Sequence, residues 1–493
     1  MAEQRQKQAE VITKTASSSI LDELIEASRI ARAPEETARA RDIIGELAQQ
    51  VLDKSMVIDG NLETAIGARI AELDALISDQ LNKVMHAEPF QKLEASWRGL
   101  SKLVQETETG ERMKIRVFNT SKQDLLKDLQ KAAEFDQSTL FKKIYEAEYG
   151  TFGGAPFGLL VGDYEFDRSP QDVELLEKIS NVAAASHAPF VSSASAGLLN
   201  LESWTDLEKP RDLAKIFSGP EYAQWRSFRD SEDSRYVALV LPHYLARLPY
   251  GKATVPVEEF DFEEDVDGTD HSKYLWSNAA YLYALRMTDA FARFGWCTAI
   301  RGVEGGGLVE NLPIHTFRTE EGEVAARCPT ETEITDRREK ELSDLGLISL
   351  VYAKNSNYAA FFSGQTVNRP KKYVDADASA NAELSARLPY LMATSRIAHY
   401  LKSIVRDKVG GFATRDSIQS FLTGWINQYI LLDDNAGQNA KAERPLRDAE
   451  VRVEEIPGQP GSFRAVAYLR PHFQLETVAV SLRLVANLPK SAG

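Results

Sequence analysis

The feature that most constrains the fold is an alternation of short apolar runs with helical patterns in the middle of the chain. The runs are rich in β-branched and aromatic residues, as buried strands are: Met113–Phe118, Phe157–Gly162, Pro189–Ser193, Tyr236–Leu241, Cys297–Ile300, Ile348–Tyr352 and Tyr358–Phe362. A helical pattern from Pro170 to Ala185 separates the second run from the third. Strands that alternate with helices are typical of α/β domains, so we expect an α/β domain with a mainly mixed sheet over residues 111–381.

Residues 1–110 lack this alternation and carry helical periodicity instead. One apolar stripe steps by three or four residues throughout, as on one face of a long helix: Leu62, Ile66, Ile70, Leu73, Ile77, Leu81 and Val84. A shorter stripe precedes it at Ile43, Ile44, Leu47 and Val51. We therefore expect a helical N-terminal region that extends to about Val104 and packs on itself or on a partner helix.

A separate helix is expected near the N-terminus, from Ser17 to Ile30, where Ser19 and Asp22 fit a capping box. Its apolar face consists of Ile20, Leu21, Leu24 and Ile25. A helix of about a dozen residues is marginal alone in water. It must either dock on the body of the protein or bind a partner, and the residues leave both alternatives open.

Residues 382–493 form a third expected domain, with helices at Leu384–Asp407 and Ile418–Leu432 and a polar stretch after them. Three strands should follow, at Val451 to Val453, Phe463–Leu469 and Val478–Val485. A small sheet of this kind has open edges, which invite a strand from another chain. The residues expected in such interchain strands are Phe463, Leu469, Val478, Val480, Leu482 and Leu484.

Composition excludes several classes of protein. The 493 residues carry 58 basic and 73 acidic side chains, a net charge of -15, which argues against binding to nucleic acid or anionic membranes and favours a basic partner. No run approaches the roughly eighteen apolar residues that a membrane span needs, and the polar N-terminus lacks the core of a signal peptide, so we expect a cytoplasmic protein without membrane insertion. Only Cys297 and Cys328 are present, too few for a disulfide framework.

The glycine cluster at Arg301–Gly307 resembles a phosphate loop but lacks the residues that such a loop needs. Gly302 and Gly307 have the G-x-x-x-x-G spacing, yet Leu308 and Val309 follow where Lys and Ser or Thr are required. We interpret these glycines as structural, because glycine permits positive φ and close backbone approach.

Other catalytic and metal-binding patterns are also incomplete. Within the acidic run from Glu258 to Asp270, residues from Glu263 imitate the opening of an EF-hand loop, but its twelfth position is Tyr274, where an EF-hand needs glutamate. The seven histidines lack zinc-binding spacing. We therefore expect no enzyme activity, cofactor or metal. A cytoplasmic nucleotide-binding or hydrolytic α/β enzyme and a simple adaptor remain the alternatives.

Several long strings in a fixed order resemble one protein family, the large sheath subunit of the bacterial type VI secretion system. These strings are HAEPFQKLEASWRGL from His86, YEAEYGTFGGAPFGLLVGDYEF from Tyr145, FRDSEDSRYVALVLPHYLARLPYG from Phe228, GWC followed by IRGVEGGGLVE, CPTE from Cys328, DRREKELSDLG from Asp336 and RPHF from Arg470. The resemblance spans nearly the whole chain.

The resemblance implies a structural subunit that works through its partners. It would pair with a small sheath subunit, polymerise helically with its own copies around an inner tube protein, meet a baseplate and propel the tube on contraction. The Ser17–Ile30 helix is similar to the one captured by the AAA+ unfoldase that recycles contracted sheaths. A family element near Asp433–Leu446 contacts the tube, which implies tube-facing roles for Asp433, Asp434, Lys441 and Arg444.

Overall fold

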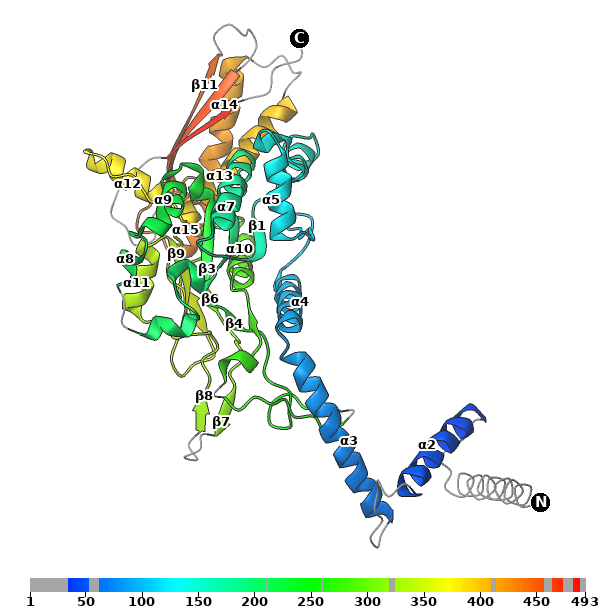
Figure 1. The fold of residues 1–493 in the computed structure, drawn as a ribbon. Helices are drawn as coiled ribbons and strands as arrows, with labels where there is room; N and C mark the ends of the chain where they lie inside the picture. The colour runs from blue at the N-terminus through cyan, green and yellow to red at the C-terminus, as the bar shows by residue number, and fades with distance from the viewer. Residues whose placement is uncertain are drawn as a thin grey trace, which may run out of the picture. The chain divides into compact units, whose positions relative to one another are not determined.

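The fold is described from a computed structural model (Figure 1). The described residues are 34–52, 62–209, 212–258, 260–268, 270–318, 324–408, 414–455, 463–472 and 482–487. The expected helix Ser17–Ile30, with Ile20, Leu21, Leu24 and Ile25, lies outside them, as do Val478 and Val480. The chain divides into two compact units, one of residues 1–84 and 250–264 and one of residues 85–249 and 265–493.

The smaller unit is helical, as expected. Helix α2 spans Pro34–Leu52, and α3 spans Leu62–Met85 and ends across the unit boundary. A connection from the middle of the sequence returns to this unit, where the Asn82 side chain donates to the backbone oxygen of Glu263 at 3.3 Å. The apolar stripe predicted on α3 is confirmed, but its members Ile70, Leu73, Ile77 and Val84 are exposed.

The larger unit is built on a six-stranded sheet in the order β1-β2-β3-β9-β10-β6. The first four are parallel: β1 (Leu160–Phe166), β2 (Phe190–Ala194), β3 (Val237–Leu241) and β9 (Leu347–Tyr352). The last two are antiparallel to their neighbours: β10 (Ala359–Phe361) and β6 (Leu308–Val309). The predicted mixed sheet is therefore confirmed.

Helices cover both faces of this sheet because its strands are apolar on both sides. In β3, Val237 and Leu239 pack in the same core as α7 (Pro170–Ser186), whereas Ala238 and Val240 pack with α10 (Ala280–Phe294). Successive strand residues point to opposite faces, so α7 and α10 must lie on opposite sides. This α/β/α arrangement is visible around β3 in Figure 1.

The remaining elements of the larger unit surround this core. The longer helices are α4 (Glu88–Glu106), α5 (Lys122–Lys131), α9 (Ala223–Asp230), α11 (Asp336–Asp344) and the π-helix η2 (Lys142–Tyr149). The short elements are α6 (Thr139–Phe141), α8 (Leu213–Ile216), β4 (Tyr244–Leu245), β5 (Trp276–Ser277), β7 (Thr316–Arg318) and β8 (Val324–Ala326).

Two predicted strands are wrong. Residues 113–118 and 297–300 are neither helix nor strand, although their composition is strand-like. Ile300 is fully buried through its side chain, so its apolar run serves the core without pairing to a neighbouring strand. A strand requires a partner backbone as well as a suitable sequence, and neither run has one in the described part of the chain.

The C-terminal part of the larger unit contains a three-stranded antiparallel sheet covered by helices. Its strands are β11 (Leu446–Glu455), β12 (Phe463–Pro471) and β13 (Leu482–Asn487), with β12 in the centre. The helices of this part of the chain are α12 (Ala376–Ser385), α13 (Leu388–Lys408), α14 (Arg415–Ile426) and α15 (Gln438–Glu443). Side chains of α13, α14 and the sheet share one apolar core. The division into three domains stays a prediction.

Candidate functional site

The glycine loop is an architectural connection. Gly302 and Gly306 have positive φ, of 71° and 90°, and a Cβ atom on Gly306 would lie 2.1 Å from the backbone oxygen of Ala299. Two amides of the loop form hydrogen bonds to backbone oxygens of the same chain: Gly302 N–H donates to Phe361 O at 2.7 Å, and Gly307 N–H donates to Gly302 O at 2.8 Å. The expected structural role of these glycines is confirmed, and the two amides point at backbone oxygens instead of a phosphate.

The strongest electrostatic cluster surrounds His243, just after β3. Its Nδ1 lies 2.5 Å from Glu331 Oε2, and its Nε2 lies 3.1 Å from Glu165 Oε1. Burial opposes the charge, but the hydrogen bonds and charges of both carboxylates outweigh burial and raise the pKa of His243 to about 10. The imidazole is therefore a cation that joins β1 to the segment before α11.

This cluster does not form a metal site, although His271 Nε2 also lies 3.6 Å from Glu331 Oε1. His243 uses both ring nitrogens for carboxylates, so neither nitrogen is available to a metal ion. Among the described residues, no group of three or more His, Cys, Asp and Glu side chains could hold a metal. Burial raises the pKa of Cys297 to about 12, which keeps that thiol protonated and unreactive.

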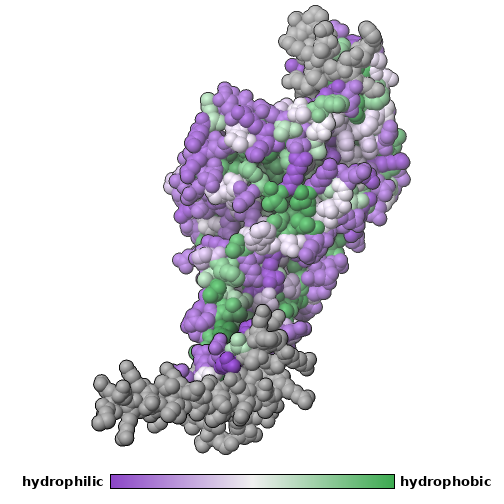
Figure 2. Space-filling model, turned by 90° about the vertical axis from the view of Figure 1, so that its right-hand side faces the viewer, coloured by the Kyte–Doolittle hydropathy of each residue, from purple (hydrophilic) through white to green (hydrophobic). Residues whose placement is uncertain are grey.

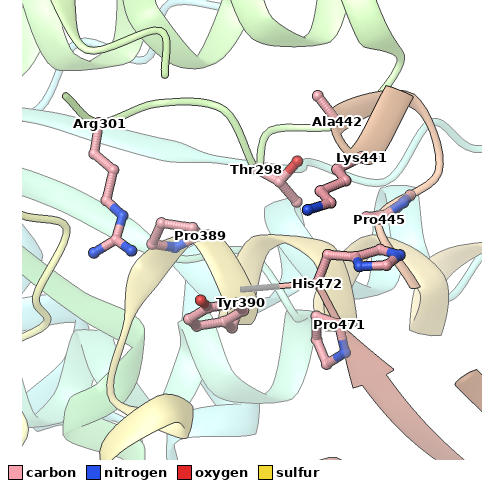
Figure 3. Close-up of a pocket in the computed structure, with 9 residues that line it drawn as sticks. All are labelled: Thr298, Arg301, Pro389, Tyr390, Lys441, Ala442, Pro445, Pro471 and His472. Atoms are coloured by element: carbon pink, nitrogen blue, oxygen red, sulfur yellow. The ribbon is translucent and has the colours of Figure 1, made fainter. Parts of the chain in front are cut away.

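Two cavities among the described residues lack the features of a catalytic site. A small pocket of about 20 Å³, room for about one water, is enclosed by the residues drawn in Figure 3: Thr298, Arg301, Pro389, Tyr390, Lys441, Ala442, Pro445, Pro471 and His472. An open polar depression of about 600 Å³ lies beyond β1 and β2, where Lys209 and Asp206 neutralise one another at 2.6 Å. Neither cavity combines an apolar wall with convergent reactive groups.

The residues expected to face a tube lie together around α15. Lys441 Nζ donates to the backbone oxygen of Asp434 at 2.6 Å, and Arg447 pairs with the Asp434 carboxylate at 2.6 Å. Asp433 accepts from the N–H of Asn435, whereas Arg444 is exposed. The segment is therefore a folded, mixed-charge turn, and its tube-facing role stays a prediction.

The residues expected in interchain strands are distributed over a sheet that is already paired within the chain. Phe463 and Leu469 lie on β12, which pairs with β11 on one side and β13 on the other. Leu482 and Leu484 lie on β13, opposite Leu469 and Ala467. The edges left for another chain are thus those of β11 and β13, and exchange between chains stays a prediction.

Two features were missed by sequence reasoning. The His243 cluster joins residues 78 and 88 positions apart, so no local spacing could indicate it. The second feature is the segment between α4 and α5, whose composition indicated a strand at residues 113–118 that the structure does not contain. Within the described ranges, no helix is both long and apolar enough to cross a membrane.

Comparison with known proteins identifies the family. The model of the EvpB/VC_A0108 tail sheath N-terminal domain matches residues 67–368, and that of the tail sheath gpW/gp25-like domain matches residues 377–488. The type VI secretion system sheath protein TssC1 of Pseudomonas aeruginosa is 52% identical over 462 residues, which cover 92% of this chain and 93% of that protein.

Solved structures show weaker likeness. The sheath tail protein of Listeria innocua aligns with a TM-score of 0.33 and 10% identity over 68% of this chain and 57% of that chain. The contracted helical sheath of the anti-feeding prophage aligns with a TM-score of 0.27 and 11% identity over 66% of each chain. The family matches and the 52% identity carry the assignment. This chain therefore belongs to the EvpB/VC_A0108 tail sheath family and is a structural protein of the type VI secretion sheath, not an enzyme.

Proposed function

We propose that this chain pairs with a small sheath subunit and polymerises helically with its own copies around an inner tube protein. One end of the polymer would meet a baseplate. Contraction would release free energy stored in the interfaces as many subunits shift together, and this would drive the tube outward. A heterologous contact that does not close generates such a filament, so interfaces take the place of an active site.

The observation that carries the proposal is the uncovered apolar stripe of α3. Ile70, Leu73, Ile77 and Val84 are each between 44% and 53% exposed. Full burial of such a side chain contributes about 1.5 to 3 kcal/mol, so an apolar helix from a partner would stabilise this face. The small sheath subunit is the partner that we propose for it.

The N-terminal helix Ser17–Ile30 would serve a different partner. We propose that an AAA+ unfoldase captures Ile20, Leu21, Leu24 and Ile25 on contracted sheaths and dismantles them for reuse in the cytoplasm. ATP would then be hydrolysed by that separate protein. The internal hydrogen bonds of the Gly302–Gly307 loop accord with this division, because the sheath subunit itself needs no nucleotide.

Co-expression with the small sheath subunit tests the proposal, with hollow striated tubules in electron micrographs as the expected result. Ile77→Asp places a charge on the stripe and should abolish tubules. Ala75→Asp is the matched control, because residue 75 lies on the opposite face of the same helix. Absence of tubules from the unsubstituted pair, or equal loss with both variants, would contradict the proposed role of the stripe.

A further inference from the structure

One face of α13 is polar although it packs against the end of α7. His399, Lys402 and Arg406 step by three and four residues along α13, so they share one face of the helix. His399 is only 2% exposed, and its Nε2 donates to the backbone oxygen of Ser186, the last residue of α7, at 2.8 Å. The ring centre of the next residue, His187, lies 6.2 Å from that of His399. Two imidazoles therefore meet where α13 packs on α7.

Tyrosine side chains surround the two imidazoles. The Tyr149 ring, at the end of η2, lies 5.9 Å from the His187 ring and 5.1 Å from the His399 ring, between ring centres. The Tyr236 hydroxyl lies 3.3 Å from Nδ1 of His187. In contrast, Nδ1 of His399 is buried without a hydrogen-bond partner among the described residues. A proton on this nitrogen would find no acceptor, so the structure favours neutral His399.

The charges closest to the imidazoles are positive. The Lys402 ammonium lies 3.6 Å from the ring centre of Tyr149 and donates to the Tyr145 hydroxyl at 3.0 Å. The Arg406 guanidinium donates to the backbone oxygen of Tyr149 at 3.1 Å. Arg396 lies nearly one turn before His399 on the same helix and acts on it as a further positive charge. A protonated imidazole would therefore be repelled by its neighbours.

Carboxylates do not compensate these cations. Residues 181–186 at the end of α7 carry no charge. The other charged groups on the neighbouring elements are Glu146 and Glu148 of η2, Asp407 of α13, and Glu232, Asp233 and Arg235 before β3. Glu146 belongs to the exposed side of η2, on the flank that carries α5 in Figure 1 and that Figure 2 faces, where hydrophilic side chains surround hydrophobic ones. Within the described ranges, neither imidazole forms an ion pair with a carboxylate.

From this arrangement we propose that His187 and His399 form an acid-sensitive lock that holds α13 on the central domain. While both imidazoles are neutral, α13 stays docked on α7 and η2. A proton on either one adds a buried positive charge that no carboxylate balances, so α13 moves away from η2 and water reaches the imidazoles. The inference concerns the chain itself and does not depend on the proposed function.

The apolar contacts of α13 determine which part of the chain the lock controls. Leu388 and Leu391, in its first turn, pack in the central core with α10, whereas Ile397, Leu401 and Val405 pack in the core of the C-terminal sheet. Opening of the lock would thus make α13 pivot about its first turn and carry the C-terminal sheet with it.

The direction of the pH dependence follows from burial. Burial, together with the charge of Lys402, lowers the pKa of His187 to about 4. Burial lowers the pKa of His399 to about 3, against the hydrogen bond to Ser186. Each pKa returns to about 6.5 when the lock opens. The closed form is therefore unaffected above pH of about 6.5 and loses about tenfold in its population ratio to the open form per imidazole and pH unit below it.

Hydrogen–deuterium exchange of the full chain between pH 7 and pH 5 tests this inference, with rates corrected for the intrinsic effect of pH. Amides at the end of η2 and in the second half of α13 should exchange about a thousandfold faster at pH 5, because two imidazoles act over about 1.5 pH units. A π-helix is uncommon, and the end of η2 depends on Arg406 of α13. The amides of β2 and β3 should remain protected.

Two substitutions remove the titration and can keep the hydrogen bonds. His399→Gln retains a donor for Ser186 O, and His187→Asn suits the positive φ of 52° at that position. Each single variant should retain an acceleration of only about thirtyfold, and the double variant should lose nearly all of it. His472→Gln is the matched control, because the Nε2 of His472 also donates to a backbone oxygen but belongs to another part of the chain. It should keep the full effect.

Three outcomes would overturn the proposal. The first is an equal acid response of the double variant and the unsubstituted chain. The second is simultaneous loss of protection in β2 and β3, which would indicate unfolding of the whole domain instead of a local opening. The third is measured on the unsubstituted chain by NMR of labelled histidines: imidazoles of His187 and His399 that titrate near pH 6.5 while η2 stays protected would show that the closed form accepts the charge.

Discussion

Gly99 of α4 lies so close to Tyr281 of α10 that a Cβ atom on Gly99 would be 2.4 Å from the Cδ2 atom of the tyrosine ring. Tyr281 is 8% exposed, so its ring has little room to move away. Helix α4 therefore packs on α10 through a position at which only glycine fits. The contact determines how α4 lies against the central domain.

Gly99→Ala should lower the free energy of unfolding by up to about 2 kcal/mol. Overpacking costs about 1 to 3 kcal/mol, and the better helix propensity of alanine offsets about 1 kcal/mol of this cost. Urea denaturation measures the change. Gly424→Ala in α14 is the control: its Cβ would meet nothing within 4 Å, so that variant should be more stable than the unsubstituted chain. Equal effects of the two variants would contradict the packing argument.

His243→Gln should lower the free energy of unfolding by about 3 kcal/mol near pH 6, because it leaves the buried carboxylate of Glu331 without its cation. The folded pKa of His243, about 10, lies above the value of about 6.5 expected in the unfolded chain. Its stabilisation is therefore complete below pH of about 6.5 and is lost as pH rises through about 10.

The measurement is urea denaturation of the unsubstituted protein and of His243→Gln at several pH values. The difference between their free energies of unfolding should narrow from about pH 6.5 to 10. Glu331→Gln removes one carboxylate of the same cluster. The difference in free energy of unfolding between this variant and the unsubstituted protein should therefore narrow over the same pH range. A constant gap across that range for His243→Gln would show that the imidazole is not held as a cation.

The extent to which sequence predicted this structure follows from the range of each interaction. The strands β2, β3 and β9 and the helix α7 were predicted because their apolar patterns are continuous and local. The two-residue strand β6 has no periodicity to recognise. Residues 113–118 have strand composition without a strand beside them, and pairing is not a local property.

The candidate site was less predictable than the fold. The family resemblance indicated partners, but the contacts that organise the surfaces join distant residues, as His243 does with Glu165 and Glu331. Exposure was also unpredictable: the α3 stripe has the same periodicity whether it is buried in its own chain or left for a partner. The apolar face of α3 was therefore predictable from sequence, whereas the element that packs against this face was not.

The unfoldase proposal predicts a separation between assembly and recycling. Leu21→Asp combined with Leu24→Asp should leave tubule formation and contraction intact while contracted sheaths accumulate, because charges on the apolar face prevent capture. Disassembly by purified unfoldase and ATP, followed by light scattering, is the measurement. Glu23→Ala with Glu26→Ala changes the polar face and should be dismantled normally. Normal disassembly of the aspartate variant would reject the Ser17–Ile30 helix as the handle.

The tube-facing proposal is tested most cleanly at Arg444. Its side chain is exposed, whereas Lys441 donates to Asp434 O, so reversing Lys441 would also disturb the local fold. Arg444→Glu should weaken sheathing of the tube by about tenfold while pairing with the small subunit is unchanged, as measured by co-purification of each partner. Lys441→Gln, which loses the internal contact without reversing charge, is the comparison. Equal loss of tube and small subunit with Arg444→Glu would indicate a folding role.

Strand exchange predicts that β13 pairs with β12 of another chain once tubules form. Each backbone hydrogen bond contributes only about 0.5 to 1.5 kcal/mol net, but pulling a strand lengthwise breaks several together. Such a link suits a lattice that rotates without separating. Truncation after Pro471 removes β13 and should leave pairing with the small subunit intact while abolishing tubules. Contractile tubules from the truncated chain would exclude β13 as the lattice link.

A disulfide between β12 and β13 distinguishes exchange from pairing within one chain. Arg464 and Asn487 are register partners, and antiparallel partners have Cα atoms about 4.5 to 5.5 Å apart, within disulfide range. With Cys297 and Cys328 replaced by serine, Arg464→Cys and Asn487→Cys together should give monomers when the free chain is oxidised. Tubules should give a ladder of linked chains on non-reducing gels, while each single-cysteine variant gives no ladder. Only monomers from oxidised tubules would mean that β13 remains in its own sheet and that other contacts hold the lattice together.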